Sequence, residues 1–509
     1  MNLVAWPVLL PLVTAAALLF VNRSPRWRTI LATSAALLTL IVDIVIVVRV
    51  LSGQVLVVQM AGWPAPYGIS LVADGLSGIM VLLSGIIGLF TVLFAASSLQ
   101  HPPRRGQGAL LNRARERLGA QALLQFLFMG VNMSFLTGDV FNLFVAFEVM
   151  LIASYGLLLL GGELPQLREG FKYVIINLVA SAVFVLAAGL AYGLFGTLNM
   201  ADIAVKLEEH GGDVRVTLVS LLLALAFATK AALFPLGFWL PNSYPTPPAA
   251  VSAFFAAILT KVGAYALIRS FTLMFPAEDY ARLILLALAG ATMLIGGFGA
   301  LSRRRWRHLF AFANVASIGY LIMGAFGGGR AGLSAGLYYL VHSVLVMFAL
   351  YLMAALGERI AGENYQVEGH LRAYPWLGAG YFVTALALAG IPPTSGFVGK
   401  FALITALFSQ GGALRIIVAV SAVATSFLLL YAGMRVWQGF FWGEADAVHR
   451  VPLPGTMRAV TIVIVGLVLL LAVASGPIFS TMERVAAQLE GNQNYIRAVL
   501  PASLGEKGE

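Results

Sequence analysis

The chain has 509 residues, of which 60% are hydrophobic and only 11% are charged. An ordinary soluble domain carries roughly 25% charged residues, so this composition excludes soluble, disordered and collagen-like chains and indicates a membrane protein. No cysteine is present, which excludes disulfides, thiolate metal sites and a cysteine nucleophile. The net charge of +10 has to be judged by where the basic residues lie relative to the membrane.

Fourteen stretches are apolar and long enough to cross a bilayer, which needs about 20 residues per helix. They lie at 3–21, 29–52, 75–99, 119–137, 139–161, 170–195, 214–240, 248–275, 282–301, 308–327, 330–356, 377–410, 413–440 and 457–479. Arginines follow the first stretch rather than precede it, so we expect a retained span and not a signal peptide. An amphipathic tail is expected at about 480–498, and the alternation in Gln54–Asp74 favours an outer hairpin.

The positions of lysine and arginine predict the orientation, because cytoplasmic loops are enriched in both. With the N-terminus outside, 19 basic residues fall in inner loops and 10 in outer loops. Both termini are therefore predicted on the outer side of the cell (plasma) membrane. The segment Arg303–His308 is expected to be an inner-face anchor at the lipid surface. Since topology explains the positive charge, we expect no nucleic-acid partner.

Three lysines lie well inside predicted spans and away from their ends, namely Lys230, Lys261 and Lys400. Each costs about 2.5–3.5 kcal/mol near the bilayer centre, so compensation or function is required. Glu148, Lys261 and His342 each lie roughly 14–20 Å into their spans, near the midplane. Ionisable groups at one depth on several helices indicate a lateral proton or ion relay. The structural alternative is an ion pair between Glu148 and Lys230, with His342 as a packing residue.

The relay chemistry follows from the opposing effects of burial and charge. Burial favours the neutral form of lysine, whereas a nearby carboxylate favours the charged form. Moving the carboxylate away, or cancelling its charge, would release the proton. The series Glu148–Lys230–Lys261–His342–Lys400 could therefore pass a proton sideways through the membrane.

Prolines interrupt the seventh and twelfth spans close to two of these lysines. Pro235 follows Lys230 by five residues, and Pro392 and Pro393 precede Lys400. Proline frees a backbone carbonyl that lipid cannot satisfy, so such breaks face protein or water. Transporters place ion sites beside broken helices at matching positions of two repeats. The broken spans are five apart, an odd number, so spans 4–8 and 9–13 are predicted to be inverted repeats.

The predicted fold is an all-α polytopic membrane protein of about 14 transmembrane helices with two inverted five-helix repeats and broken seventh and twelfth helices. Residues 1–118 form three transmembrane helices and a basic loop, and 119–275 form the first repeat. Residues 282–440 form the second repeat, and 441–509 form the last transmembrane helix and the amphipathic tail. Asp43 in the second span has no cation in helical register with it and receives no role.

Two segments resemble the family of proton-translocating antiporter-like subunits. FNLFVAFEVMLIASYGL around Glu148 is similar to the family's fifth span. PLGFWLPNSYPTPPAAVSAFFAAILTKVGAYALIR, from Pro235 to Arg269, resembles the D subunits of Mrp-type multisubunit Na⁺/H⁺ antiporters. The resemblance covers roughly residues 70–440 and implies the fourteen-helix fold shared with complex I subunits. It also implies an essential acid at Glu148, an essential lysine at Lys230, a connecting lysine at Lys261 and a terminal lysine at Lys400.

The chain departs from its relatives at two places. Some relatives carry a lysine shortly after the eleventh-span histidine, where this chain has Val346 and Met347. The middle of the path is therefore expected to depend on His342 and water. The complex I subunit closest in pattern has glutamate in place of Lys400, and its seventh-to-eighth loop differs from NSYPTPP. Both differences favour the Mrp family.

The expected function is proton translocation in a multisubunit antiporter that exchanges H⁺ for Na⁺ or another monovalent cation. Its expected partners are the other antiporter subunits, membrane lipids, Na⁺ and H⁺, with no cofactor and no metal. No Ser-His-Asp set, metal-spaced histidines or nucleotide motif occurs, so no enzyme is expected. A cation site needs clustered oxygens and Glu148 is the one clear mid-membrane carboxylate, so the Na⁺ route is expected in a partner subunit or at an interface. The alternatives are a membrane subunit of a complex I-like or membrane-hydrogenase redox complex, and an assembly scaffold.

Overall fold

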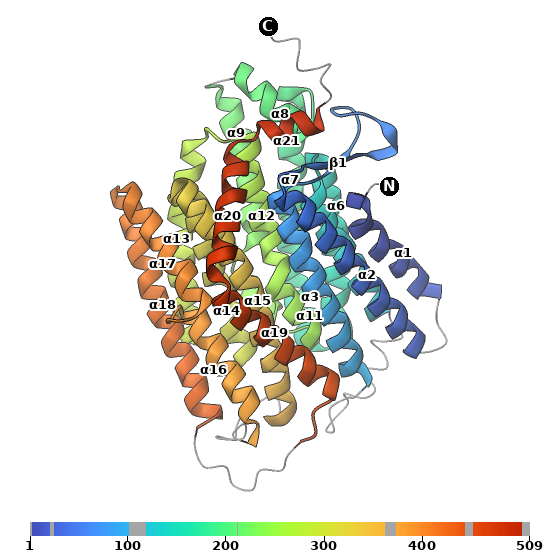
Figure 1. The fold of residues 1–509 in the computed structure, drawn as a ribbon, viewed down its shortest axis with the longest axis vertical. Coiled ribbons are helices and arrows are strands. Elements are labelled where there is room, and N and C mark those ends of the chain that lie inside the picture. The colour runs from blue at the N-terminus through green and yellow to red at the C-terminus, as the bar shows by residue number, and fades with distance from the viewer. Residues whose placement is uncertain are drawn as a thin grey trace.

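The computed structural model describes residues 3–20, 25–100, 119–210, 212–361, 373–442 and 451–500. Its helices run side by side, mostly along the long axis of the molecule (Figure 1). The first and last helices, α1 and α21, begin and end near the same end of this bundle (Figure 1).

The first part of the bundle contains α1 (Trp6–Phe20), α2 (Pro25–Leu51), α3 (Gly75–Gln100), α5 (Ala120–Leu136), α6 (Val140–Leu159), α7 (Leu164–Phe195), α8 (Met200–Lys206), α9 (Val214–Ala231), α10 (Leu240–Ser243), α11 (Ala249–Phe254) and α12 (Thr260–Arg269). Two π-helical turns, Phe255–Leu259 and Ser270–Met274, join α11 to α12 and extend α12. The second part contains α13 (Asp279–Leu301), α14 (Trp306–Gly327), α15 (Gly329–Ala361), α16 (Pro375–Ala389), α17 (Ser395–Gln410), α18 (Ala413–Phe440), α19 (Gly455–Val473), α20 (Ser475–Glu490) and α21 (Gln493–Val499).

Within the described residues, 12 helices are long and apolar enough to cross a membrane. Two shorter apolar helices, Ala120–Leu136 and Pro375–Ala389, complete the set, and each of these helices overlaps one of the predicted spans. The prediction of a helical, multi-pass membrane protein is confirmed. Two of the described elements are strands: β1 (Leu56–Gln59) pairs antiparallel with β2 (Ser70–Ala73) inside the segment predicted as a hairpin.

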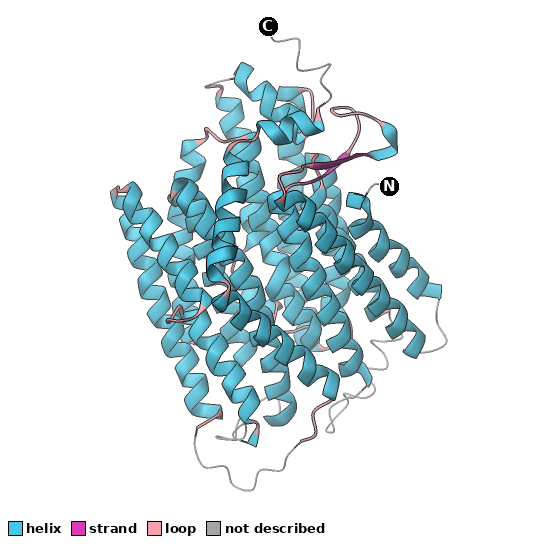
Figure 2. Ribbon diagram, in the orientation of Figure 1, coloured by secondary structure: helices cyan, strands magenta, loops and turns pink. Residues whose placement is uncertain are grey.

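The seventh and twelfth spans are not continuous helices. α9 ends at Ala231, and the next residue, Ala232, has a left-handed φ of 62°. α16 ends at Ala389, and Gly390 follows with a φ of 85°. The predicted runs 214–240 and 377–410 are therefore each interrupted, and Figure 2 shows loop segments within the helical bundle.

The predicted boundary of the last span is wrong by several residues. α19 ends at Val473, and α20 begins at Ser475, before the predicted end at 479. Pro477 lies in the first turn of α20, where a missing N–H is tolerated, so the sequence restarts a helix there. The buried face of α20, which includes Val485 and Leu489, packs on α15 and α3.

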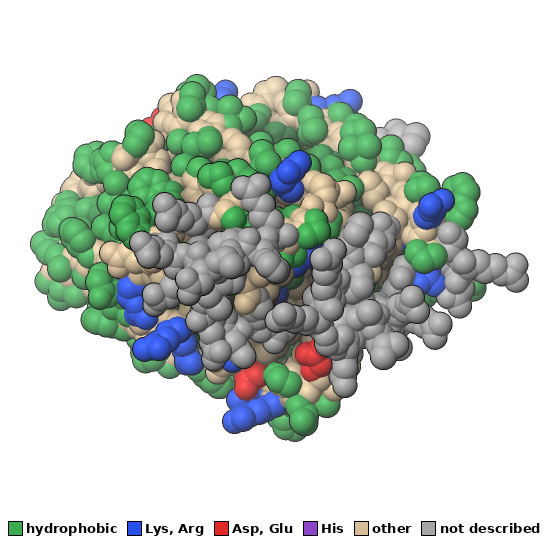
Figure 3. All heavy atoms as spheres, turned by 90° about the horizontal axis from the view of Figure 1, so that it is seen from below, with side chains coloured by type: hydrophobic (Ala, Val, Ile, Leu, Met, Phe, Trp, Pro, Cys, Tyr) green, Lys and Arg blue, Asp and Glu red, His purple; other side chains and the backbone are tan. Residues whose placement is uncertain are grey.

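The outer helices, including α2, α7 and α18, expose large apolar side chains along one face, while α12, α14 and α15 are almost wholly buried. Figure 3 looks onto the end opposite the hairpin, where Lys and Arg side chains are more frequent than acidic ones and lie among apolar side chains and along the lower edge. The expected inner-face anchor at Arg303–His308 is only partly correct. Trp306 is fully buried, and Arg307 donates to the carbonyls of Pro245 and Pro247 and pairs with Glu358. Arg307 therefore fixes the loop that carries Pro245 and Pro247, and Trp306 packs against Tyr381 and Phe440 instead of facing lipid.

Candidate functional site

The predicted site residues lie on five different helices and face the interior of the protein. Glu148 is on α6, Lys230 is in the last turn of α9, Lys261 is on α12, His342 is on α15 and Lys400 is on α17. Lys261 is 0% exposed, and the other two lysines and His342 are at most 5% exposed, whereas Glu148 is half-buried. Lys261 therefore does not face lipid.

Ser181 on α7 connects Glu148 with Lys230. Its hydroxyl donates to Glu148 Oε1 and accepts from Lys230 Nζ at 3.2 Å. Among the described residues, no direct ion pair joins the two charged groups. A hydroxyl that donates on one side and accepts on the other can transmit a proton between them.

An aromatic cluster surrounds this bridge. Phe147, Phe184 and Phe227 meet edge to face, with ring centroids 4.9–5.9 Å apart. Lys230 Nζ lies 5.2 Å from the Phe147 centroid, a distance at which the ring face attracts a cation. The rings supply apolar surface that limits water around the bridge, so the ammonium depends on Ser181 and the nearby carboxylate.

Two neutral oxygens hold the ammonium of Lys261. Nζ donates to Asn314 Oδ1 at 2.7 Å and to the carbonyl of Ala256 at 2.9 Å. Ala256 lies in the π-helical turn that precedes α12, and such turns are frequent at functional sites. A Cβ on Gly263 would lie 2.5 Å from the backbone nitrogen of Ala231, so glycine allows α12 to approach α9 next to Lys230.

His342 is linked to the start of α17. Its Nδ1 lies 2.9 Å from the hydroxyl of Ser395, and its ring lies 5.3 Å from that of Tyr339. Tyr339 in turn contacts Tyr320 of α14, with centroids 5.2 Å apart. A Cβ on Gly396 would lie 1.8 Å from the carbonyl oxygen of Ala387 and 3.0 Å from the imidazole, so glycine allows the start of α17 to approach α16 beside the ring.

Lys400 occupies the break in the twelfth span. Its Nζ donates to the carbonyls of Leu388 at 2.8 Å and Ala389 at 3.1 Å, and to the hydroxyl of Ser426 at 3.1 Å. The ring of Tyr320 lies beneath it at 4.4 Å. The carbonyls belong to the C-terminal end of α16, where the helix dipole favours a cation.

At both breaks, backbone polar groups form hydrogen bonds with other parts of the protein. At Pro235, the amide of Phe234 donates to Thr292 Oγ1 at 2.9 Å, and Trp239 Nε1 donates to the carbonyl of Thr229 at 3.2 Å. This pairing explains how a non-helical segment is tolerated within the bundle.

Pro392 and Pro393 lie in the second break, between α16 and α17. The carbonyls of Leu388 and Ala389, which have no helical partner at the end of α16, accept hydrogen bonds from Lys400 of α17. All three predicted helix-breaking prolines therefore lie in interrupted segments next to the lysines.

The helices that carry the site residues pack against one another in series. α9 packs on α12, α12 on α14, α14 on α15, and α15 on α17. Within the described parts of the chain, hydrogen bonds form separate clusters around Lys230, Lys261, His342 and Lys400 and do not form one continuous chain. Proton movement along the row therefore requires side-chain motion or water between the clusters.

Sequence reasoning did not single out Ser181, Asn314, Ser395 and Ser426. Uncharged polar residues occur in many helices, where hydroxyls bond the carbonyl one turn back, as Ser134 does with Gly130. Their presence in a span therefore carries no distinguishing signal, and only the fold shows which of them meet a lysine or the histidine.

A second buried charge cluster joins the hairpin to the bundle. Arg269 forms two 2.7 Å hydrogen bonds with Asp74 and lies between the rings of Tyr265 and Tyr495. Burial raises the pKa of the Asp74 carboxyl, but the charge and hydrogen bonds of Arg269, with hydrogen bonds from Ser77, outweigh it and leave the pKa below its usual value. This pair connects α3, α12 and α21.

Asp43 remains without a role. It is 0% exposed, and neither carboxylate oxygen has a hydrogen-bond partner among the described residues. It packs against Gly85 of α3, where a Cβ would lie 2.3 Å from Asp43 Oδ2.

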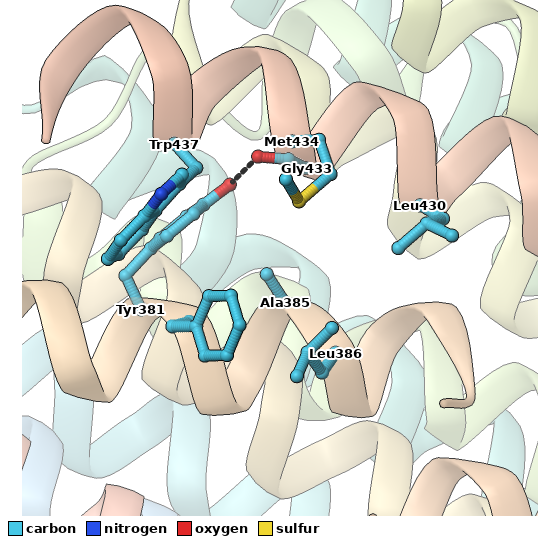
Figure 4. A pocket seen from close by; sticks show the side chains of 8 residues that line it. Tyr381, Ala385, Leu386, Leu430, Gly433, Met434 and Trp437 are labelled. Atoms are coloured by element: carbon cyan, nitrogen blue, oxygen red, sulfur yellow. Dashed lines mark hydrogen bonds between the residues drawn. The ribbon is translucent and has the colours of Figure 1, made fainter. Parts of the chain in front are cut away.

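A pocket between α16 and α18 is separate from the row. Tyr381, Leu386, Leu430 and Trp437 contribute to its lining, and the Tyr381 hydroxyl donates to the carbonyl of Gly433 at 3.0 Å (Figure 4). Its lining carries no ionisable group except the tyrosine. Across the described residues, no group of three or more His, Asp or Glu side chains could hold a metal ion.

Comparison with known proteins gives matches along the whole chain. Residues 137–428 match the family "NADH:quinone oxidoreductase/Mrp antiporter, TM". The chain is 38% identical over 504 residues to the D subunit of the Na⁺/H⁺ antiporter of Alkalihalophilus pseudofirmus, covering 98% of this chain and 99% of the relative. It is 36% identical over 506 residues to the corresponding D subunit of Bacillus subtilis, covering 98% and 99%.

Solved structures show the same fold. A chain of the Mrp complex from Dietzia sp. superposes with a TM-score of 0.88 at 29% identity, covering 98% of this chain and 99% of that chain. A chain of respiratory complex I from Thermus thermophilus superposes with a TM-score of 0.79 at 25% identity, covering 96% and 99%. The chain thus belongs to the NADH:quinone oxidoreductase/Mrp antiporter transmembrane family, and it resembles the antiporter D subunits over its full length.

Proposed function

We propose that this protein is the D subunit of an Mrp-type multisubunit Na⁺/H⁺ antiporter and that it carries the proton. It is a transporter subunit of the bacterial membrane rather than an enzyme. The observation that supports the proton role most strongly is the Glu148–Ser181–Lys230 bridge, in which a buried cation and a half-buried acid share one hydroxyl. The full-length likeness to D subunits supports the antiporter assignment.

The proposed path runs from Glu148 through Lys230, Lys261 and His342 to Lys400. Each lysine donates to at least one neutral oxygen, and the ammonium groups of Lys230 and Lys400 also face an aromatic ring. Neutral oxygens hold an ammonium without fixing it permanently, because they supply no full opposing charge. A change in the charge of one residue of the path then alters the proton affinity of the next residue.

We further propose that residues 119–275 and 282–440 are two inverted repeats, following residues 1–118 and preceding 441–509. Breaks at similar places, beside Lys230 and Lys400, support this division. The termini and the hairpin are assigned to the outer side, and the end seen in Figure 3 to the inner side, because its Lys and Arg side chains follow the positive-inside rule. The partners are the other antiporter subunits, through which we expect Na⁺ to pass.

A second candidate is a membrane subunit of a redox-driven complex. A chain of the archaeal membrane-bound sulfane sulfur reductase has a TM-score of 0.87 to this one at 22% identity, which supports the shared fold alone. The two functions differ in their energy source. Antiport driven by a Na⁺ gradient without an electron donor supports the first candidate and excludes the second.

The test of the proton role uses Glu148→Ala and Lys230→Ala in the assembled complex. Each variant should insert and assemble in normal amounts but lose Na⁺-dependent proton movement in inverted vesicles. Near wild-type antiport by assembled variants would refute the proposed role of this pair.

A further inference from the structure

The two polar atoms of the Asn314 side chain differ in their hydrogen bonding. Its Oδ1 accepts from Lys261 Nζ at 2.7 Å. Its Nδ2 is buried and has no hydrogen-bond partner in the described part of the chain, although the residue is 0% exposed. Because an ammonium only donates hydrogen bonds, it determines which end of the amide faces Lys261.

An unpartnered amide nitrogen in the protein interior requires an explanation, since nearly all buried polar groups are hydrogen-bonded. Internal water is the usual partner where polar groups gather. Thr260, the residue before Lys261, is also fully buried, and its Oγ1 has no partner among the described residues. Two unsatisfied polar groups therefore occur at the lysine in the middle of the row.

Asn314 also lies on a helix that contacts both halves of the row. α14 contacts Lys261 through Asn314, and six residues further on it contacts Lys400 through the ring of Tyr320. α14 also packs on α15, which carries His342. A water bound at Nδ2 would lie next to α14, beside the hydrogen-bonded cluster of Lys261.

We infer that Asn314 is a positioning residue of the proton path, an inference that rests on the proposed function. Its Oδ1 orients the Lys261 ammonium and its Nδ2 binds an internal water. In the transfer, an N–H bond of Lys261 breaks and its electron pair stays on Nζ. The water gains that proton and releases one of its own to the next base, His342, so the water remains neutral.

The test compares Asn314→Leu with the matched control Asn132→Leu. Asn132 on α5 is also buried with one unpartnered amide atom, but it donates to the carbonyl of Pro7 at 2.8 Å and not to a lysine. Loss of a hydrogen bond to a charged group predicts a fall in antiport of about tenfold or more for Asn314→Leu. Its pH profile should also change, whereas Asn132→Leu should keep the wild-type rate and profile. Both variants should assemble normally.

Lys230→Ala in the same vesicles separates failure of this inference from failure of the proposed function. If Lys230→Ala abolishes antiport while Asn314→Leu matches its control, only the role of Asn314 is wrong. If Lys230→Ala retains antiport, the relay itself is wrong.

A second measurement decides the matter if Asn314→Leu does not assemble. A high-resolution cryo-electron microscopy map of the wild-type complex should show a water within about 3.2 Å of Asn314 Nδ2. Density for the amide with no water there would overturn the inference.

Discussion

Replacing Glu148 with glutamine separates a proton relay from a static ion pair. Glutamine keeps the shape of the side chain and an oxygen that can accept from Ser181, but it removes the negative charge. The two hydrogen bonds in series place Lys230 Nζ at most about 6 Å from the carboxylate oxygen. At an effective dielectric constant of about 20, the lost attraction is about 3 kcal/mol.

A free-energy change of this size alters the ratio of charged to neutral Lys230 about a hundredfold. The ammonium loses stabilisation, so Lys230 would retain its proton only at lower pH. We therefore expect Glu148→Gln to assemble normally, to transport poorly, and to show a pH profile displaced by about two units towards acid. Glu148→Asp should retain partial activity, because the charge remains on a shorter side chain.

The assay is Na⁺-dependent proton movement as a function of pH in vesicles that contain matched amounts of assembled complex. Glu169→Gln is the control, since Glu169 is paired with Lys172 at 2.9 Å near the start of α7 and takes no part in the bridge. An unaltered profile for Glu148→Gln, or failure of that variant to assemble, would refute the relay role of the pair.

Four further predictions concern other parts of the structure. Ser181→Ala should reduce antiport by about tenfold or more because it removes both bonds of the bridge, whereas Ser220→Ala, whose hydroxyl bonds only a backbone carbonyl, should transport like wild type in the same assay. Asp74→Asn leaves a buried arginine unpaired and should lower the free energy of unfolding by about 3–5 kcal/mol, measured by denaturant unfolding of the purified subunit. The pKa of Asp74 in the folded protein lies below its ordinary value, so the Asp74 carboxylate stabilises the fold above about pH 4, and this stabilisation is lost as the pH falls through the lowered pKa. A purified subunit that is equally stable at pH 3 and pH 7 would contradict this. Gly390→Ala should reduce antiport without preventing insertion, since the position has a φ of 85° and a Cβ would lie 2.7 Å from Lys400 Cδ; wild-type antiport would show that the position of Lys400 is unimportant.

Much of the fold was predictable because lipid imposes a simple rule on the sequence. A helix that crosses the bilayer needs a long apolar run, so each of the membrane-spanning helices overlaps a predicted span. The lysines were identifiable for the same reason, since a charge in such a run is costly wherever it points. The breaks were signalled by proline, but their ends at Ala231 and Ala389 depend on tertiary contacts.

The partners of the charged residues were not predictable. Ser181 and Asn314 carry no formal charge, so their presence in a span costs little and gives no sign of function. The buried pair of Asp74 and Arg269 joins residues 195 positions apart, and nothing in the sequence linked the two. The boundary between α19 and α20 was missed because both helices are apolar on at least one face across Ala474.

The central claim is that protons move laterally through buried lysines, and Lys261 tests it most directly because it lies in the middle of the row and is 0% exposed. The measurement is Na⁺-driven proton flux by the purified complex in liposomes, with Lys261→Leu compared with wild type at equal amounts of assembled complex. We expect Lys261→Leu to assemble and to lose Na⁺-driven proton flux. Flux close to wild type would show that the proton does not pass through this row.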